Sequence, residues 1–69
     1  MYNLSIPIRI ELSRLDEKTW NMCCFFGKEI VPYYQTRISE RQREKPSLLR
    51  KIAAEKLYIT YEVTFDRIM

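Results

Sequence analysis

The first part of the chain alternates strictly between apolar and polar side chains, and this pattern constrains the fold more than any other feature. Apolar residues occupy every second position from Leu4 to Leu12, and the residues of the opposite side are Asn3, Ser5, Pro7, Arg9 and Glu11. A two-residue period is typical of a strand with one buried face. Because proline cannot donate to a strand ladder, Pro7 predicts an edge strand, or one in which this position points away from its neighbour.

The C-terminal part of the chain alternates in the same way. Apolar side chains fall at Ile59, Tyr61, Val63 and Phe65, and the positions between and around them are Tyr58, Thr60, Glu62, Thr64 and Asp66. This pattern predicts a second strand. We expect the two strands to be adjacent and to bury a common face made by Ile6, Ile8, Ile10, Ile59, Tyr61 and Val63.

A first helix is predicted between these strands, over residues 14–26. Ser13 and Asp16 resemble a capping box, and Gly27, the only glycine, stands where a helix C-cap would be. At 100° per residue one apolar stripe contains Leu15, Thr19, Met22, Cys23 and Phe26. Trp20 and Cys24 lie nearly opposite that stripe, so this helix is expected to be apolar on two sides.

Two further helices are predicted on either side of Pro46. Pro32 suits the first turn of the second helix, which ends before Pro46 because the residue preceding a proline is pushed out of the helical region. Ser47 can cap the third helix. Its apolar face is expected to contain Leu49, Ile52, Ala53 and Leu57.

These elements predict one α+β domain over residues 1–69, in the order β-α-α-α-β, with two terminal strands packed against three helices. A chain of 69 residues has a marginal core, and two strands make a marginal sheet. Cys23 and Cys24 are adjacent, which suits an ordinary disulfide poorly, and the chain has no histidine to hold zinc. We therefore expect a dimer that joins strands into a four-stranded sheet, or docking on a partner.

The charge is concentrated in residues 35–51, which hold six basic and two acidic side chains and so carry a net charge of +4. One interpretation is a phosphate-binding patch, with Tyr33 and Tyr34 beside it to stack on bases. The other is a solvated helix face on which Glu40 and Glu44 pair with neighbouring arginines. Both interpretations stay open at this point.

Trp20 is the second candidate feature, because an aromatic side chain opposite the core stripe is typical of a protein interface. The alternative is that other elements of the chain cover it. The two cysteines indicate small buried hydrophobes rather than reactive thiols. The residues predicted to bind a partner are Arg37, Arg41, Arg43, Lys45, Arg50, Lys51, Tyr33 and Trp20.

The residue inventory argues against an enzyme. There is no histidine to act as a base near neutral pH, and no glycine-rich loop precedes a helix. We therefore expect no catalytic site, no cofactor and no metal. The chain also lacks a leader pattern and any apolar run of about 20 residues, so we expect a cytoplasmic protein.

The order of elements over residues 4–45 resembles that of ribbon-helix-helix DNA-binding dimers, in which paired strands enter the major groove. This resemblance implies that the outward strand residues would face DNA: Asn3, Ser5, Pro7, Arg9 and Glu11. Only Arg9 is a good base reader among them, whereas Pro7 and Glu11 fit poorly. The helix and strand after Pro46 also depart from the minimal plan of that family.

The function predicted first is a small non-enzymatic regulator or inhibitor that occupies the surface of a larger protein or nucleoprotein. Compact chains without catalytic residues often have this role, including many encoded by mobile genetic elements. The alternative is a dimeric DNA- or RNA-binding protein that uses the basic stretch or the N-terminal strand.

Overall fold

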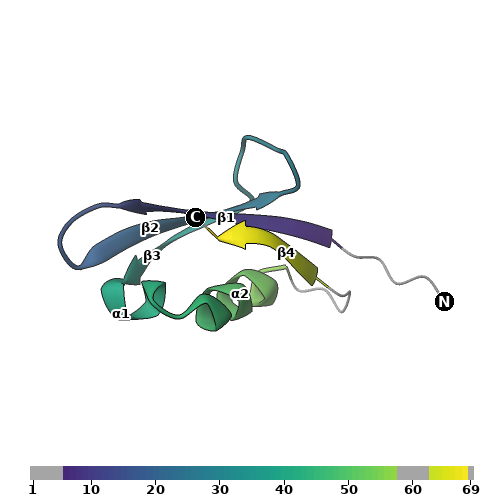
Figure 1. The fold of residues 1–69 in the computed structure, drawn as a ribbon. Coiled ribbons are helices and arrows are strands. Elements are labelled where there is room, and N and C mark those ends of the chain that lie inside the picture. Colours follow the sequence, from purple (N-terminus) through teal and green to yellow (C-terminus); the bar gives the residue numbers. More distant parts are fainter. Residues whose placement is uncertain (1–5, 58–62, 69) are drawn as a thin grey trace.

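The computed structural model describes residues 6–57 and 63–68 and contains four strands and two helices (Figure 1). In chain order the elements are β1 (Ile6–Arg14), β2 (Thr19–Phe26), β3 (Tyr34–Ser39), α1 (Glu40–Arg43), α2 (Pro46–Glu55) and β4 (Val63–Ile68).

The strands form one sheet in the order β3-β2-β1-β4. β1 and β2 are antiparallel, as are β2 and β3, whereas β4 pairs in parallel with β1. β3 and β4 therefore run in the same direction at opposite edges, and the chain must cross the sheet between them. α1 and α2 lie on this crossing and cover one face, while the loop between β2 and β3 rises on the other (Figure 1).

The expected β-α-α-α-β order is wrong, and the largest error is the helix predicted over residues 14–26. This segment instead contains the end of β1, a turn and the whole of β2. Trp20, Met22, Cys24 and Phe26 are every second residue of β2 and all pack in or against the core. The residues that suggested a helix with two apolar sides are therefore the alternating residues of a strand. Aromatic and β-branched side chains also favour a strand.

The helix predicted to begin at Pro32 is also wrong, because residues 34–39 form β3. Here Tyr34, Thr36 and Ile38 face the helices, and Ile38 is buried in the core. Helix α1 begins only after Ser39, whose hydroxyl accepts from the Gln42 backbone N–H. The Gln42 side chain in turn accepts from the Ser39 backbone N–H, which completes a capping box.

The third predicted helix is present as α2, but it begins two residues early, with Pro46 in its first turn and Lys45 at the N-cap position in place of Ser47. Strands are also present where the two terminal strands were predicted, and β1 and β4 are neighbours. Of the expected buried face, Ile8 and Ile10 are buried, whereas Ile59, Tyr61 and the side chains of Ile6 and Val63 lie outside what the structure describes. One copy already has four strands, so the reason given for a strand-joining dimer is also wrong.

Pro7 does not mark an edge strand, because β1 lies between β2 and β4. The Gly27 N–H donates to the Pro7 carbonyl at 2.9 Å, so these residues form a hydrogen-bonded pair whose reciprocal donor is missing. A guanidinium nitrogen of Arg9 donates to the Gly27 carbonyl at 2.9 Å. The Arg9 side chain thus replaces the backbone N–H that Pro7 lacks, and this explains how an interior strand accepts proline.

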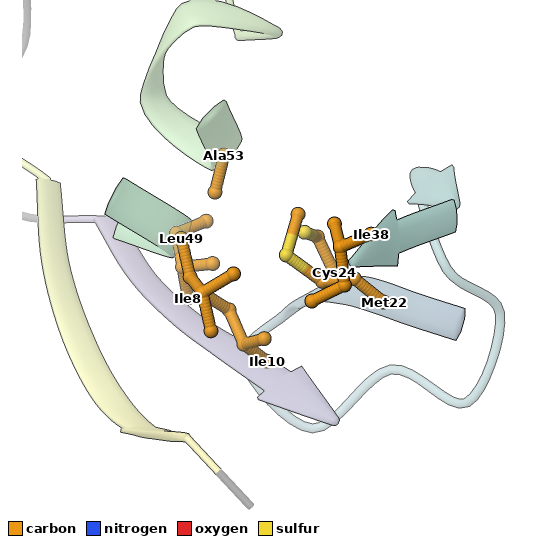
Figure 2. Close-up of a cluster of buried hydrophobic side chains, with 7 residues drawn as sticks. All are labelled: Ile8, Ile10, Met22, Cys24, Ile38, Leu49 and Ala53. Atoms are coloured by element: carbon orange, nitrogen blue, oxygen red, sulfur yellow. The ribbon is translucent and has the colours of Figure 1, made fainter. Parts of the chain in front are cut away.

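The core lies between the sheet and α2, and its side chains point toward one another (Figure 2). Leu49 and Ala53 of α2 are fully buried against strand residues that alternate along β1, β2 and β3, namely Ile8, Ile10, Met22, Cys24 and Ile38. Leu49 and Ala53 are four residues apart and so occupy one face of the helix. This apolar contact positions α2, and with it the basic residues on the outer side of the helix.

Candidate binding surface

The predicted binding residues are distributed over most of the fold. Trp20 is in β2, Tyr33 precedes β3 and Arg37 is within β3. The other five belong to the helical layer and its connection: Arg41, Arg43, Lys45, Arg50 and Lys51. The structure places these eight side chains in three different environments.

The first environment is a cluster around Trp20 whose charged groups pair with one another within the chain. The guanidinium groups of Arg14 and Arg43 lie over the Trp20 ring, 4.5 and 4.6 Å from its centroid. The indole N–H donates to Glu40 Oε2. Arg43 donates to the other oxygen of the same carboxylate through two nitrogens, at 3.0 and 2.9 Å. Trp20 and Arg43 are therefore engaged within the chain.

Glu40 is the centre of this cluster, and its pKa is held below the ordinary carboxyl value. The first cause is the hydrogen bond from the Trp20 indole, and the second is the hydrogen bond from Arg43. Arg14 adds an ion pair at 3.3 Å. Glu40 at the first position of α1 thus joins β1, β2 and α1, and the pairing between Glu40 and a neighbouring arginine that the sequence offered as one interpretation is present.

The second environment is the core margin at Tyr33. Its ring stacks on Phe26 with centroids 4.3 Å apart, and its hydroxyl donates to the Ala53 carbonyl at 3.2 Å. Burial raises the pKa of this hydroxyl, and the neighbouring Cys24 thiol adds to the rise. Tyr33 therefore ties the β2–β3 connection to α2, and one face of its ring is already occupied.

The third environment is solvent. Arg41, Lys45 and Lys51 are exposed on α1, on the connection and on α2. Among the side chains that the structure describes, the ion pairs use Arg9, Arg14 and Arg43, and none involves these three. Arg50 is exposed beside Lys51. We define Arg41, Lys45, Arg50 and Lys51 as the basic surface, which lies on the helical layer.

Arg37 is separate from the basic surface. It is exposed in β3, where the alternation places it on the side of the sheet opposite the buried Ile38 and therefore away from the helices. Its positive charge contributes to lowering the pKa of Asp16, after the hydrogen bonds from the Lys18 and Thr19 groups that are the main causes. The contiguous patch predicted for residues 35–51 is thus divided between two faces of the sheet.

Sequence reasoning missed the role of Arg9, which makes several contacts on the open face. It pairs with Glu11 at 2.7 Å, lies over the Phe25 ring at 4.4 Å, and donates to the carbonyls of Gly27 and Glu29. These contacts hold the start of the β2–β3 loop. The only sequence signal was Pro7 two residues earlier, since a proline within a strand needs another donor nearby.

Among the described residues, no group of three or more histidine, cysteine or acidic side chains is arranged to hold a metal ion. A shallow depression at the β1–β2 turn is lined by Asp16, Glu17, Lys18 and Thr19. No helix in residues 6–57 has the length and apolar character needed to cross a membrane.

Comparisons with known proteins add nothing to the description of the basic surface. No protein-family model, curated protein or solved structure matches the chain.

Proposed function

We propose that the protein is a small non-enzymatic regulator that binds an acidic region of a larger protein through the basic surface. The observation that carries this proposal is the exposure of Arg41, Lys45 and Lys51 without an ion pair among the described residues. Exposed charges of one sign steer a complementary partner and fix its orientation.

The rigidity of the underlying scaffold supports this proposal. α1 is fixed by its capping box and by the Glu40 cluster, and α2 is fixed by the burial of Leu49 and Ala53. Their exposed side chains are therefore presented from an ordered surface. Such preorganisation lowers the entropic cost of binding.

An acidic protein surface fits the basic surface better than bare nucleic acid does. Sequence-tolerant binding of single strands relies on aromatic rings open for stacking, whereas Trp20 is covered by two guanidinium groups and Tyr33 by Phe26. The ribbon-helix-helix layout is contradicted, because β1 lies inside a four-stranded sheet and residues 14–39 contain two strands where that family has helices. Arg9, the residue best suited to read bases in that layout, instead donates to Glu11 and to the Gly27 carbonyl of its own chain.

Affinity capture from the native host's lysate, with and without nuclease, tests the proposal. The double variant Arg41→Glu with Lys45→Glu should lose the partner while its circular dichroism spectrum is unchanged. Lys18→Glu with Lys28→Glu is the matched control, since both lysines are exposed, lie in turns of the sheet, and give the same change in net charge. Capture that survives the first double variant would place the contact elsewhere.

The salt dependence of binding distinguishes the two kinds of partner. If about four phosphates were neutralised, log affinity would fall against log salt with a slope near −3.6, a loss of roughly a hundredfold between about 50 and 200 mM. A protein partner should show a smaller loss and should be captured after nuclease treatment. Loss of the captured material on nuclease treatment would contradict a protein partner.

A further inference from the structure

The outer edge of β3 is regular and carries no strand among the described residues. The sheet order leaves β3 and β4 at its two edges. The pairing of β1 with β4 shifts register between Ile8 and Arg9, whereas β3 pairs with β2 without a shift from Tyr34 to Ser39. Irregular pairing protects an edge from further association, so β3 is the edge better suited to accept another strand.

The hydrogen bonds around β3 show which backbone groups point outward. The Glu40 N–H donates to the Lys18 carbonyl, so residue 40 faces β2. Because the direction alternates along an antiparallel strand, Thr36 also faces β2, while Gln35 and Arg37 direct their N–H and carbonyl groups away from the sheet. The Ser39 N–H fits this alternation, since its acceptor is the Gln42 side chain and not a strand.

We infer that two copies of the protein associate through β3, antiparallel and about a two-fold axis at Thr36. In this register Gln35 of one copy lies opposite Arg37 of the second copy, and the reverse pair is identical by symmetry. Each pair exchanges two N–H···O bonds, which uses the outward groups of both residues. The weak contact of the Thr36 hydroxyl with the Arg37 carbonyl, at 3.4 Å, leaves that carbonyl available for the stronger bond.

Side-chain chemistry favours this register over the one with its axis at Arg37. Arg37 is the only charged residue of β3. An axis at Arg37 would place two guanidinium groups opposite each other, and like charges in that position are destabilising. An axis at Thr36 places each guanidinium opposite the neutral amide of Gln35, which can accept its hydrogen bond. On the helix-covered face, the Thr36 side chains of the two copies lie opposite each other, and such threonine pairs are favourable.

The arrangement of the layers also suits a second copy. A two-fold axis between antiparallel neighbours is perpendicular to the sheet, so both helical layers lie on the same side and the two sheets join edge to edge. The loop before β3 and helix α1 after β3 lie on opposite sides of the sheet (Figure 1). The association uses β3 alone, so it holds whichever partner the basic surface binds.

Sedimentation equilibrium with amide hydrogen exchange on the unmodified chain tests the association. We expect the mass to rise with concentration from 8.4 kDa toward twice that value. The Gln35 and Arg37 amides should gain protection with the dimer, whereas the Thr36 amide, already bonded to β2, should be protected at every concentration. A monomer at concentrations up to about 1 mM, or a dimer in which the two outward amides gain no protection, would overturn the inference.

Charge substitutions at position 35 test the register. Gln35→Glu should tighten the dimer about 2- to 30-fold, because two symmetric ion pairs with Arg37 replace neutral contacts. Gln35→Lys should weaken it by a similar factor. Ser47→Glu, an exposed position on α2, is the control for added negative charge and should leave the dimer unchanged. Equal effects of the position-35 variants and the control would reject the Thr36 axis.

Arg37→Pro provides an independent test, because it removes an N–H that faces outward rather than one that bonds β2. The variant should be monomeric over the concentration range in which the unmodified chain dimerises. If it fails to fold, the opposite effects of the two position-35 substitutions still decide the question.

Discussion

The two faces of the sheet differ in what holds them, although their residues alternate along the same strands. The helix-covered face is apolar and closed, with Ile8, Ile10 and Met22 fully buried. The open face is held by polar contacts, chiefly those of Arg9 with Glu11 and with the loop carbonyls. In so thin a domain, packing can stabilise only one face of the sheet, and the other relies on hydrogen bonds and a cation over an aromatic ring.

The largest expected difference between the faces is in core packing. Ile10→Ala should lower the free energy of unfolding by about 2 to 5 kcal/mol, because it leaves a cavity beneath α2. Ser13→Ala, an exposed position on the open face of the same strand, should change it by less than about 0.5 kcal/mol. Urea denaturation followed by circular dichroism measures both. Similar losses for the two variants would refute the distinction between the faces.

The adjacent cysteines probe the two faces by chemistry. Cys24 is buried in the core, and burial raises the pKa of its thiol to about 11, whereas Cys23 lies half-buried on the open face. Iodoacetamide should modify Cys23 first and Cys24 about 100-fold more slowly, since Cys24 must await unfolding of a domain stable by about 3 kcal/mol. Mass spectrometry of peptides resolves the sites. In denaturant the two rates should converge.

Arg9 tests the polar support of the open face. Arg9→Lys should cost about 1 to 3 kcal/mol, because an ammonium group cannot reach Glu11 and the carbonyls of Gly27 and Glu29 together. Arg41→Lys, an exposed control, should cost less than about 0.5 kcal/mol. Thermal denaturation of both variants gives the comparison. An unaffected Arg9→Lys protein would mean that those hydrogen bonds are replaceable by water.

The smallest expected effect is the pH dependence of the Glu40 cluster. Glu40 has its pKa lowered from 4.5 by the Trp20 and Arg43 hydrogen bonds, so its contribution to stability is present above that value and is lost as the pH falls through the lowered pKa. Melting temperatures between about pH 6 and pH 3 should therefore fall more for the unmodified chain than for Glu40→Gln. Emission from Trp20, the only tryptophan, should change over the same range. Parallel curves for the two proteins would argue against this linkage.

The parts of the fold that sequence predicted correctly are those in which only one period fits. Residues 6–12 alternate without exception, and the helix after Pro46 has Leu49 and Ala53 four residues apart. In β2 the adjacent pairs Cys23–Cys24 and Phe25–Phe26 fit both periods. Phe25 faces away from the core and is nevertheless 8% exposed, in contact with Arg9. A second buried environment on the open face obscured the two-residue period of this strand.

The residues that predicted the ends of a helix at 14–26 are also common in turns between strands. Asp16 was interpreted as part of a helix cap, but its carboxylate accepts from the Lys18 N–H within the β1–β2 turn. Gly27 was interpreted as a helix C-cap, and it has the positive φ of 54° that such a cap uses, but at the end of β2. Both residue types satisfy the backbone in turns as well as in caps. Only the tertiary pairing of the strands distinguishes these uses.

For the candidate site, the sequence predicted the exposure of Arg41 and Lys45, and it offered the internal use of Arg43 and Trp20 only as alternatives to partner binding. The cluster that holds them joins Arg14, Trp20 and Glu40, which are separated by 6 and 20 positions in the chain. Such a contact depends on the pairing of β1 with β2 and of β2 with β3. Because that pairing was not predicted, neither was the cluster.

The exchange of a backbone donor for a side chain at Pro7 and Arg9 has a consequence for how the sequence can change over time. While proline occupies position 7, the Gly27 carbonyl relies on position 9 for its donor. Any residue with an N–H at position 7 would supply that donor and release position 9 from this requirement. The two positions are therefore expected to be epistatic, and the order in which they are substituted decides which intermediates fold.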